Sequence, residues 1–255
     1  MGFPAVPLQS MGLEIPPMHT DQTFRFPVPP FAQRCLDAAR DAWGASFTHP
    51  FVRALVEGTL DPQRFRFYQM QDARYLEAFA DACALVSVRC VDPDDKAWWL
   101  DAAKLALVVE RDLHAGYGRT LGYDAADIAA LALTPNNHAY QTHMLAAATR
   151  GTLVEAIAAV APCPWLYVHL GQAFERELGG GIPDAHPFAA WLRMYADPGF
   201  DAYMTTLLAQ LERAAVAADE PARARAVTAF VQSAHYEWMF WEQAWTAQRW
   251  PASAD

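Results

Sequence analysis

Residues 61–90 read DPQRFRFYQMQDARYLEAFADACALVSVRC, and this stretch has the pattern of a long amphipathic helix. Asp61 can cap the amino end, and Pro62 suits the first helical turn. Beyond them apolar side chains recur every three to four residues, which is the period of a helix with one buried face. The stretch therefore predicts a helix from Pro62 to about residue 90.

The same pattern continues along the chain from Phe31 onward. Ala, Leu, Arg and Glu dominate there, and all four are strong helix formers. Asp92-Pro93 and Thr134-Pro135 repeat the combination of a capping residue and a proline, and no segment alternates as a strand would. Neither a flexible linker nor a repeat divides the chain, so we expect an all-α, single-domain helical bundle over residues 31–250. The other expected helices cover about 31–46, 50–57, 93–117, 124–131, 135–149, 152–178, 187–195, 198–217 and 221–248.

The two ends of the chain differ from this helical body. The first thirty residues are rich in proline and have no apolar period, so residues 1–30 are expected to form an irregular arm. Residues 251–255 are expected to form a short tail. The amino end lacks the basic and apolar regions of a signal peptide. No run reaches the roughly 18 apolar residues that a membrane helix needs, so no membrane association is expected.

Composition and charge exclude several classes of protein. The chain has 255 residues, 19 Lys and Arg against 29 Asp and Glu, and a formal net charge of −10. Such a balance argues against nucleic acid or an anionic membrane as the main partner. Four cysteines, at positions 35, 83, 90 and 163, show no zinc-binding spacing. They are typical of a reduced, cytoplasmic protein.

One carboxylate falls on the apolar stripe of the helix after Pro62. Asp72 lies four residues after Tyr68 and three before Tyr75. A buried carboxylate is costly unless it is paired or hydrogen-bonded. The sequence leaves two interpretations open: a structural salt bridge with an arginine such as Arg66 or Arg74, or a functional group in a pocket.

The last expected helix repeats this arrangement. Glu237 shares a face with Phe230, Ala234 and Trp241, so it lies among apolar and aromatic side chains. Desolvation would raise its pKa and make it a candidate acid near neutral pH. A paired glutamate in the core is equally compatible with the pattern.

Cys163 has the most unusual sequence context. Pro162 and Pro164 flank it inside an otherwise helical pattern, and each proline removes a backbone donor and bends a helix. Such a bend can direct the thiol into a cavity, with Tyr167 on the same helical face. The alternative is a cysteine that fills the core as a small apolar group.

Histidines give weaker signals. Glu110 and His114 have an i, i+4 spacing that could present two metal ligands, but a second copy is missing, so a structural pair is expected. His49 precedes Pro50 and is expected to cap or pack locally. Carboxylates among aromatic rings, a cysteine at a bend and several tyrosines together indicate a site for a flat ring with polar edges.

Seven segments of the chain match one known family in order. The chain resembles the thiaminase II (TenA) family, in its cysteine-containing branch, which has a haem-oxygenase-like all-α fold. The resemblance covers about residues 31–250. The matching segments are SFTHPFVRALVEGTL (46–60), FRFYQMQDARYLEAF (65–79), ERDLH (110–114), AYQTHM (139–144), PCPWLY (162–167), WLRMYADPGF (191–200) and HYEWMFWEQAW (235–245).

The resemblance implies an aminopyrimidine aminohydrolase that hydrolyses fragments of degraded thiamin, or thiamin itself, to hydroxymethylpyrimidine for thiamin salvage. Its partner would be a small pyrimidine substrate, without metal or organic cofactor, and the protein would be a homotetramer. By resemblance, Cys163 adds to the ring, Glu237 protonates a ring nitrogen with support from Tyr195, and Asp72 binds the amino edge. The remaining implied site residues line the pocket: Tyr75, Tyr140, Tyr167 and Phe240.

Three features depart from the family pattern: the proline-rich arm is extra, Pro164 stands beside Cys163 where an aromatic residue is common, and Trp238 follows Glu237 where another aromatic residue is expected. Two other functions remain as alternatives. One is a pyrimidine-binding protein without catalysis, and the other is an oxidase of the same fold that uses a metal or oxygen.

Overall fold

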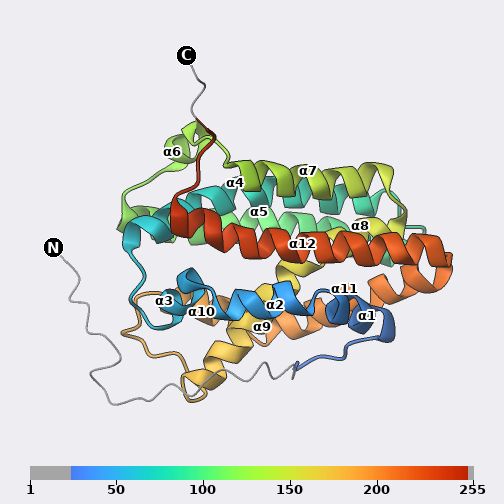
Figure 1. Cartoon of the computed structure of the whole chain (residues 1–255), viewed down its shortest axis with the longest axis horizontal. Coiled ribbons are helices and arrows are strands. Elements are labelled where there is room, and N and C mark those ends of the chain that lie inside the picture. The colour runs from blue at the N-terminus through green and yellow to red at the C-terminus, as the bar shows by residue number, and fades with distance from the viewer. Residues whose placement is uncertain (1–23, 252–255) are drawn as a thin grey trace.

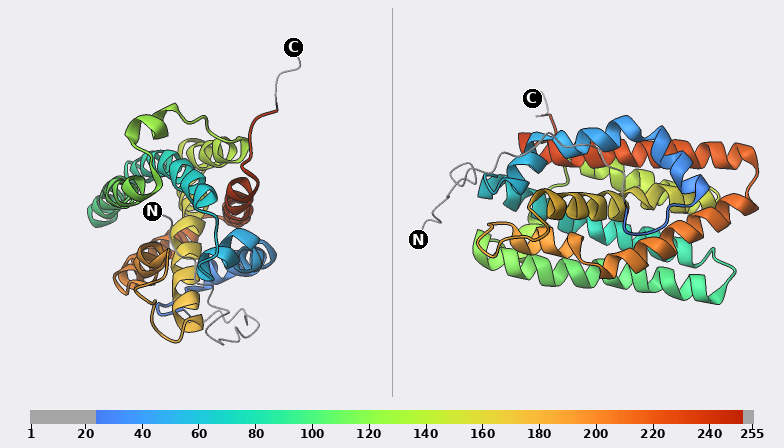
Figure 2. Two further views of the ribbon diagram at one scale, coloured as in Figure 1. Left: turned by 90° about the vertical axis from the view of Figure 1, so that its left-hand side faces the viewer. Right: turned by 90° about the horizontal axis from the view of Figure 1, so that it is seen from below.

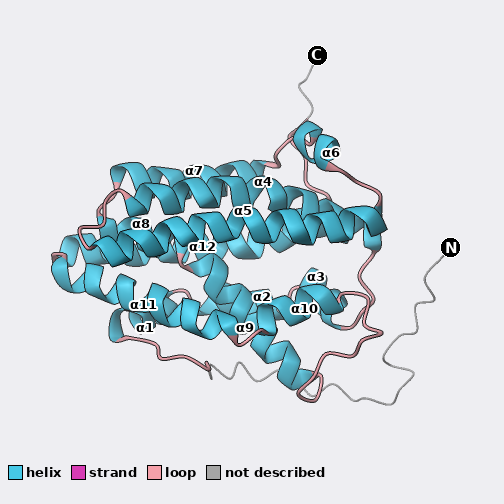
Figure 3. Ribbon diagram, turned by 180° about the vertical axis from the view of Figure 1, so that it is seen from behind, coloured by secondary structure: helices cyan, strands magenta, loops and turns pink. Residues whose placement is uncertain are grey.

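The computed structural model describes residues 24–251, without the side chains of residues 109–115, and this range contains helices and no strand (Figure 1, Figure 3). The all-α prediction is therefore confirmed. The helices of the described range are α1 (Pro30–Ala38), α2 (Arg40–Thr48), α3 (Pro50–Val56), α4 (Pro62–Ser87), α5 (Pro93–Leu121), α6 (Ala125–Ala130), α7 (Pro135–Arg150), α8 (Leu153–Val160), α9 (Pro162–Glu177), α10 (Ala189–Ala196), α11 (Gly199–Ala217) and α12 (Glu220–Thr246).

Side-chain caps fix the start of three long helices where the sequence predicted them. Asp61 and Asp92 each accept a hydrogen bond from the backbone N–H two residues further on, both at 2.8 Å. The Thr134 hydroxyl accepts one from the N–H of Asn137 at 3.0 Å. These bonds satisfy amide groups that the first turn leaves without a helical partner. Two predicted helices, 31–46 and 152–178, are each broken into two. Both ends of every other helix lie within four residues of the predicted positions.

The prediction of one helix over 152–178 is wrong, because the chain breaks into α8 and α9 at Ala161. Pro162 and Pro164 have no N–H to donate to the preceding turn, so the helical ladder cannot continue across them. From this point α9 runs obliquely across the bundle (Figure 1, Figure 2). The break places Cys163 in the first turn of α9.

The predicted helix 31–46 is also two helices, α1 and α2, which meet at Ala39. The backbone of Ala39 leaves helical geometry, with φ −92° and ψ 2°. No proline or glycine marks this position, so the local sequence gives no signal for the bend. Tertiary packing accounts for it, since α1 packs against α11 and α12 while α2 packs along α12 and α3.

The helices form two layers around a largely aromatic core. In one layer α4 packs along α5 and α7, and α12 packs along α8 and α7 (Figure 1). In the other layer α1, α2 and α3 lie beside α10 and α11, and α9 passes through the middle (Figure 2). Fully buried Trp and Phe side chains from both layers meet between them. A cavity between the layers is therefore surrounded by rings.

Within the described part of the chain, one helical stretch, Leu153–Glu177, has the length and apolar composition of a helix that crosses a membrane. However, 78% of its most apolar window is buried inside the protein. It comprises α8 and α9, which are core helices.

Of the predicted arm, residues 24–29 lie in the described range and precede the first helix; residues 1–23 and the predicted tail beyond residue 251 lie outside it.

Candidate active site

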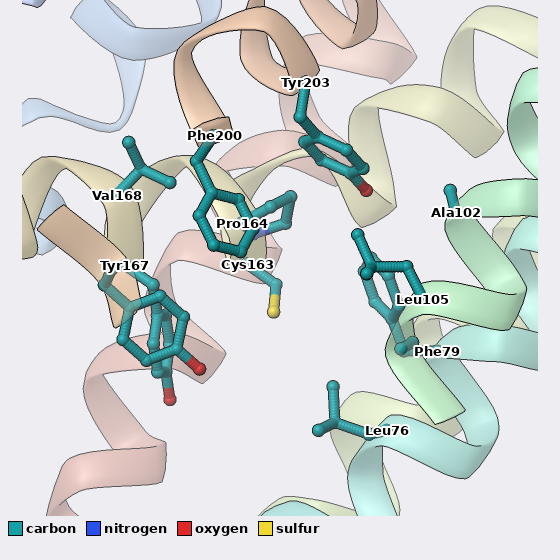
Figure 4. Close-up of a pocket in the computed structure, with 12 residues that line it drawn as sticks. Leu76, Phe79, Ala102, Leu105, Cys163, Pro164, Tyr167, Val168, Phe200 and Tyr203 are labelled. Carbon is teal, nitrogen blue, oxygen red and sulfur yellow. The ribbon is translucent and has the colours of Figure 1, made fainter. Parts of the chain in front are cut away.

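Cys163 lines a pocket of about 570 Å³, part of which is open to solvent, between the two layers of helices. The walls come from α4, α5, α9, α10 and α11, and they are mainly aliphatic and aromatic. Figure 4 shows the Cys163 sulfur pointing into the space between Tyr167 and Leu105. The thiol is partly accessible, whereas Cys35, Cys83 and Cys90 are buried. The bend at Pro162 therefore brings one cysteine to a cavity, which is the first of the two interpretations that the sequence left open.

Glu237 lies beside this thiol and is buried, with 2% of its surface exposed. The Tyr140 hydroxyl donates a hydrogen bond of 2.6 Å to the Glu237 Oε1. Burial raises the pKa of Glu237 to about 8, and the negative charge of Asp72 acts in the same direction. Hydrogen bonds from Tyr140 and from the Cys163 thiol oppose this rise. Near neutral pH the Glu237 carboxyl can therefore both hold and release a proton.

Asp72 is a second buried carboxylate, with 5% of its surface exposed, and its charge acts on both Glu237 and Cys163. Burial raises its pKa to about 7. The arginines considered as its salt-bridge partners pair with other carboxylates: Arg66 lies 4.0 Å from Asp127, and Arg74 lies 3.8 Å from Glu77. Asp72 thus contributes a carboxyl group that changes protonation state close to physiological pH.

The Cys163 thiol holds its proton firmly in the free protein. Burial raises its pKa, and the negative charges of Glu237 and Asp72 raise the pKa further, while hydrogen bonding with the Tyr75 hydroxyl lowers it. A thiol is a nucleophile only as the thiolate. Cys163 therefore needs a base in contact with it, and Glu237 is placed to act as one.

Tyr75, Tyr140 and Phe240 form an aromatic cluster near Glu237. The ring of Tyr75 lies 4.9 Å from that of Tyr140 and 5.5 Å from that of Phe240, centroid to centroid. The Tyr75 hydroxyl donates to the sulfur of Met144 at 3.3 Å. Three residues that the resemblance assigned to the pocket therefore lie together.

Tyr167 and Tyr195 form an aromatic wall, with ring centroids 4.8 Å apart, and both line the pocket with Cys163. The Tyr68 hydroxyl donates to that of Tyr167 at 3.0 Å and accepts a bond from the Trp191 indole at 3.4 Å. Tyr68 stood on the predicted stripe without an assigned role, and Trp191 gave no signal, because its partner lies far away in sequence. The support of Glu237 by Tyr195 remains a prediction. The tyrosine that donates a hydrogen bond to the Glu237 carboxyl in the structure is Tyr140.

The histidine predictions have different outcomes. The His49 side chain caps α3 by accepting a hydrogen bond from the N–H of Phe51, and its other ring nitrogen lies 3.1 Å from Glu242, so its local role is confirmed. The side chains of Glu110 and His114 lie outside the described residues. Among the described side chains, no three of His, Cys, Asp or Glu come together as candidate metal ligands.

Comparisons with known proteins agree with the family resemblance found in the sequence. An aminopyrimidine aminohydrolase from Halalkalibacterium halodurans is 32% identical over 223 residues, covering 86% of this chain and 97% of that protein. A solved structure of a TenA family transcription regulator from Silicibacter sp. TM1040 superposes with a TM-score of 0.78 at 25% identity, covering 86% of this chain and 98% of that one.

The fold is also that of a domain with a heme oxygenase-like fold from Shewanella denitrificans OS217, with a TM-score of 0.65 at 13% identity over 84% of this chain and 92% of that one. The expected haem-oxygenase-like fold is therefore confirmed. A family model for the TENA/THI-4/PQQC family matches residues 36–247. Because that match spans most of its length, the chain belongs to the TENA/THI-4/PQQC family.

Proposed function

We propose that this protein is an aminopyrimidine aminohydrolase of the thiaminase II type. Its substrates are aminomethylpyrimidines derived from thiamin, with thiamin as a second candidate, and its product is hydroxymethylpyrimidine for thiamin salvage. The observation that carries the proposal is the contact between the Cys163 thiol and the buried Glu237 carboxyl at an aromatic pocket. The likeness to an aminopyrimidine aminohydrolase over nearly the whole chain supports it.

The contact between Cys163 and Glu237 supports a proton relay. Glu237 as carboxylate accepts the thiol proton, and the resulting thiolate adds to an electron-poor ring carbon. Glu237 then delivers that proton to a ring nitrogen, which keeps the charge balanced. The electron pair that the addition places in the ring expels the amino group, which arrives protonated as ammonium and leaves as ammonia. Water adds to the exocyclic methylene and its released proton passes to the ammonia. Glu237 takes back the proton of the ring nitrogen as the thiolate leaves, and its return to the sulfur restores the aromatic product and the Cys163 thiol.

The other site residues have binding and orienting roles in this proposal. Asp72 accepts hydrogen bonds from the amino edge of the pyrimidine, because a carboxylate suits N–H donors. Tyr140 holds Glu237 through the 2.6 Å bond. Tyr75, Tyr167 and Phe240 present ring faces and edges to the flat substrate, and Tyr195 supports Glu237 across the pocket.

The test uses the full chain and a panel of thiamin, aminomethylpyrimidine and its formylated form, with products detected by mass spectrometry. We expect the wild type to form hydroxymethylpyrimidine, and Cys163→Ala to lose activity by more than about 10³-fold while it still binds substrate. Cys90→Ala, which replaces a buried cysteine in the connection between α4 and α5, is the matched control and should retain activity.

Near wild-type turnover by Cys163→Ala would contradict the proposal. Saturable binding of the pyrimidine by the wild type without product would favour a binding protein instead. The raised pKa of Cys163 is the observation that keeps this second function in view, because a protonated thiol does not attack.

The proposal also includes a homotetramer in the cytoplasm, with no nucleic acid or membrane as partner. Leu100 and Leu107 lie one heptad apart on α5 and are 52% and 48% exposed, which supports burial of this face by another copy. The four described cysteines are free, in keeping with a reducing compartment. Light scattering should give the mass of an oligomer, and a monomer would contradict the assembly.

A further inference from the structure

A short segment just before α1 packs against the outside of α9. The ring of Phe24 lies 4.6 Å from that of His169 and 5.5 Å from that of Trp165, while Phe26 is buried. These residues precede the part of the chain that the family model matches, which begins at residue 36. The two phenylalanines anchor the segment on both sides of Arg25.

Arg25 uses this anchored position to contact three helices. Its Nη2 donates to the carbonyl oxygen of Ala196 at 2.7 Å, its Nη1 lies 3.2 Å from Glu175, and its Nε lies 3.1 Å from Asp201. Asp201 also accepts a hydrogen bond of 2.9 Å from Gln172. One guanidinium therefore joins the end of α9, the end of α10 and the first turn of α11.

The contact with Ala196 is at a structurally demanding point. The carbonyl groups of the last helical turn lack partners within the helix, and a cation there also complements the helix dipole. Arg25 thus caps α10 from a distant part of the chain. The neighbouring peptide, between Tyr195 and Ala196, packs against α9, because a Cβ on Gly171 would lie 2.3 Å from the carbonyl carbon of Tyr195. Two consecutive peptides at the end of α10 are therefore held, one by Arg25 and the other by α9.

This end of α10 belongs to the pocket wall. Tyr195 immediately precedes the capped carbonyl, and Phe200 lies just beyond the turn that joins α10 to α11. Both side chains line the pocket with Cys163, and Figure 4 draws Phe200 among the residues that line it. Displacement of this turn would therefore move the aromatic side chains of Tyr195 and Phe200 relative to the Cys163 thiol.

We propose that Arg25 is a positioning residue for the reaction: it clamps the α10–α11 turn and so holds Tyr195 and Phe200 in register with Cys163. The proposal rests on the proposed function for its kinetic consequence. The role proposed for Arg25 is to position the turn and not to stabilise the fold, because partly exposed ion pairs such as those of Arg25 contribute little to stability. The segment before α1 thereby gains a role in the chemistry of the site.

The test is Arg25→Met in the full chain, which keeps much of the aliphatic stem and removes the charge and the donors. We expect kcat/KM to fall about tenfold, since small displacements of positioned groups are costly to catalysis. The melting temperature should fall by no more than about 4 °C. Arg34→Met is the matched control: it removes the ion pair of α1 with Glu220 at 2.7 Å, away from the pocket, and should retain wild-type kcat/KM.

A second variant identifies the route of the effect. In a Tyr195→Phe background the further loss caused by Arg25→Met should shrink to less than about twofold, because the group that Arg25 positions is already changed. Full additivity of the two losses, or unchanged kcat/KM in Arg25→Met, would overturn the proposal.

Alkylation of the thiols, followed by peptide mass spectrometry, separates failure of this proposal from failure of the proposed function. The rate at Cys163 should rise severalfold in Arg25→Met but not in Arg34→Met, with Cys83 still protected by burial. This readout needs no turnover, so it stands even for a protein that binds without catalysis. Equal labelling of Cys163 in wild type and Arg25→Met, or labelling of Cys83 at the same increased rate, would overturn the proposal.

Discussion

At the scale of single residues, the chemistry of the site depends on where one proton resides. Glu237 is buried and Cys163 is largely enclosed by the pocket, and desolvation raises the pKa of each group. The relay therefore starts only when Glu237 has lost its own proton and can accept that of the thiol. As the pKa of Glu237 is about 8, we expect kcat/KM to rise as the pH approaches and passes this value.

Removal of the Tyr140 hydroxyl should move this rise to higher pH. The hydrogen bond from Tyr140 favours the carboxylate and lowers the pKa of Glu237, so Tyr140→Phe should raise the pKa further. At pH 7 the variant should be less active than the wild type, by about tenfold for a shift of one unit. The measurement is kcat/KM from pH 6 to pH 9.5. Tyr236→Phe, whose ring stacks on Tyr140 at 5.3 Å, is the control, and a profile of Tyr140→Phe equal to wild type would contradict the role.

At the scale of helices, the packing of α10 on α9 positions the aromatic wall of Tyr167 and Tyr195. Gly171 permits this packing, since α9 meets the backbone of Tyr195 and Ala196 where a side chain would stand. The contact has to be this close because Tyr195 and Tyr167, one from each helix, pack ring against ring in the pocket wall. A glycine within a helix costs conformational entropy, so its presence here indicates a steric requirement.

Gly171→Ala should therefore push α10 away from α9. We expect a loss of about 2 kcal/mol or more in the free energy of unfolding, in line with overpacking of a tight contact. Gly116→Ala on α5 is the opposite case, because a Cβ there meets nothing within 4 Å. It should stabilise the protein by about 0.5–1 kcal/mol through helix propensity. Urea unfolding of both variants compares them, and equal stabilities would contradict the steric interpretation.

At the scale of the whole molecule, the buried carboxylates link folding to pH. The pKa of Glu237 is about 8 in the folded protein against 4.5 for the ordinary group, and that of Asp72 is about 7 against 3.8. At any pH between the ordinary and the folded pKa of each group, the folded protein keeps a proton that the unfolded chain releases. Stability from these groups is therefore fully present below about pH 4 and is lost as the pH rises toward 8.

Glu237→Gln should flatten this dependence. A neutral amide resembles the protonated acid and has no charge to bury at high pH, so the variant should lose less stability than wild type between pH 5 and pH 8. Thermal unfolding at pH 5, 6.5 and 8 measures the difference. Glu77→Gln alters an exposed carboxyl on α4 and should follow the wild-type curve. Parallel curves for Glu237→Gln and wild type would contradict the linkage.

Several features could be predicted from the sequence because short-range rules govern them. The capped starts at Asp61, Asp92 and Thr134 depend on neighbours within three residues. The periods that placed Asp72 and Glu237 on apolar faces depend on one helix each. The prolines around Cys163 signalled a bend, although the sequence did not show that the bend ends one helix and begins another.

The sequence by itself determined an all-α chain, where most of its helices begin, and which carboxylates and which cysteine stand out from their surroundings. Only the tertiary structure decided which groups meet: that Tyr140 bonds Glu237 across 97 residues, that the chain bends at Ala39, and that Arg25 reaches Ala196. The physical reason is that capping and periodicity act within a turn or two of one helix. Contacts between distant residues depend instead on how whole helices cross, which the packing of the entire core sets at once.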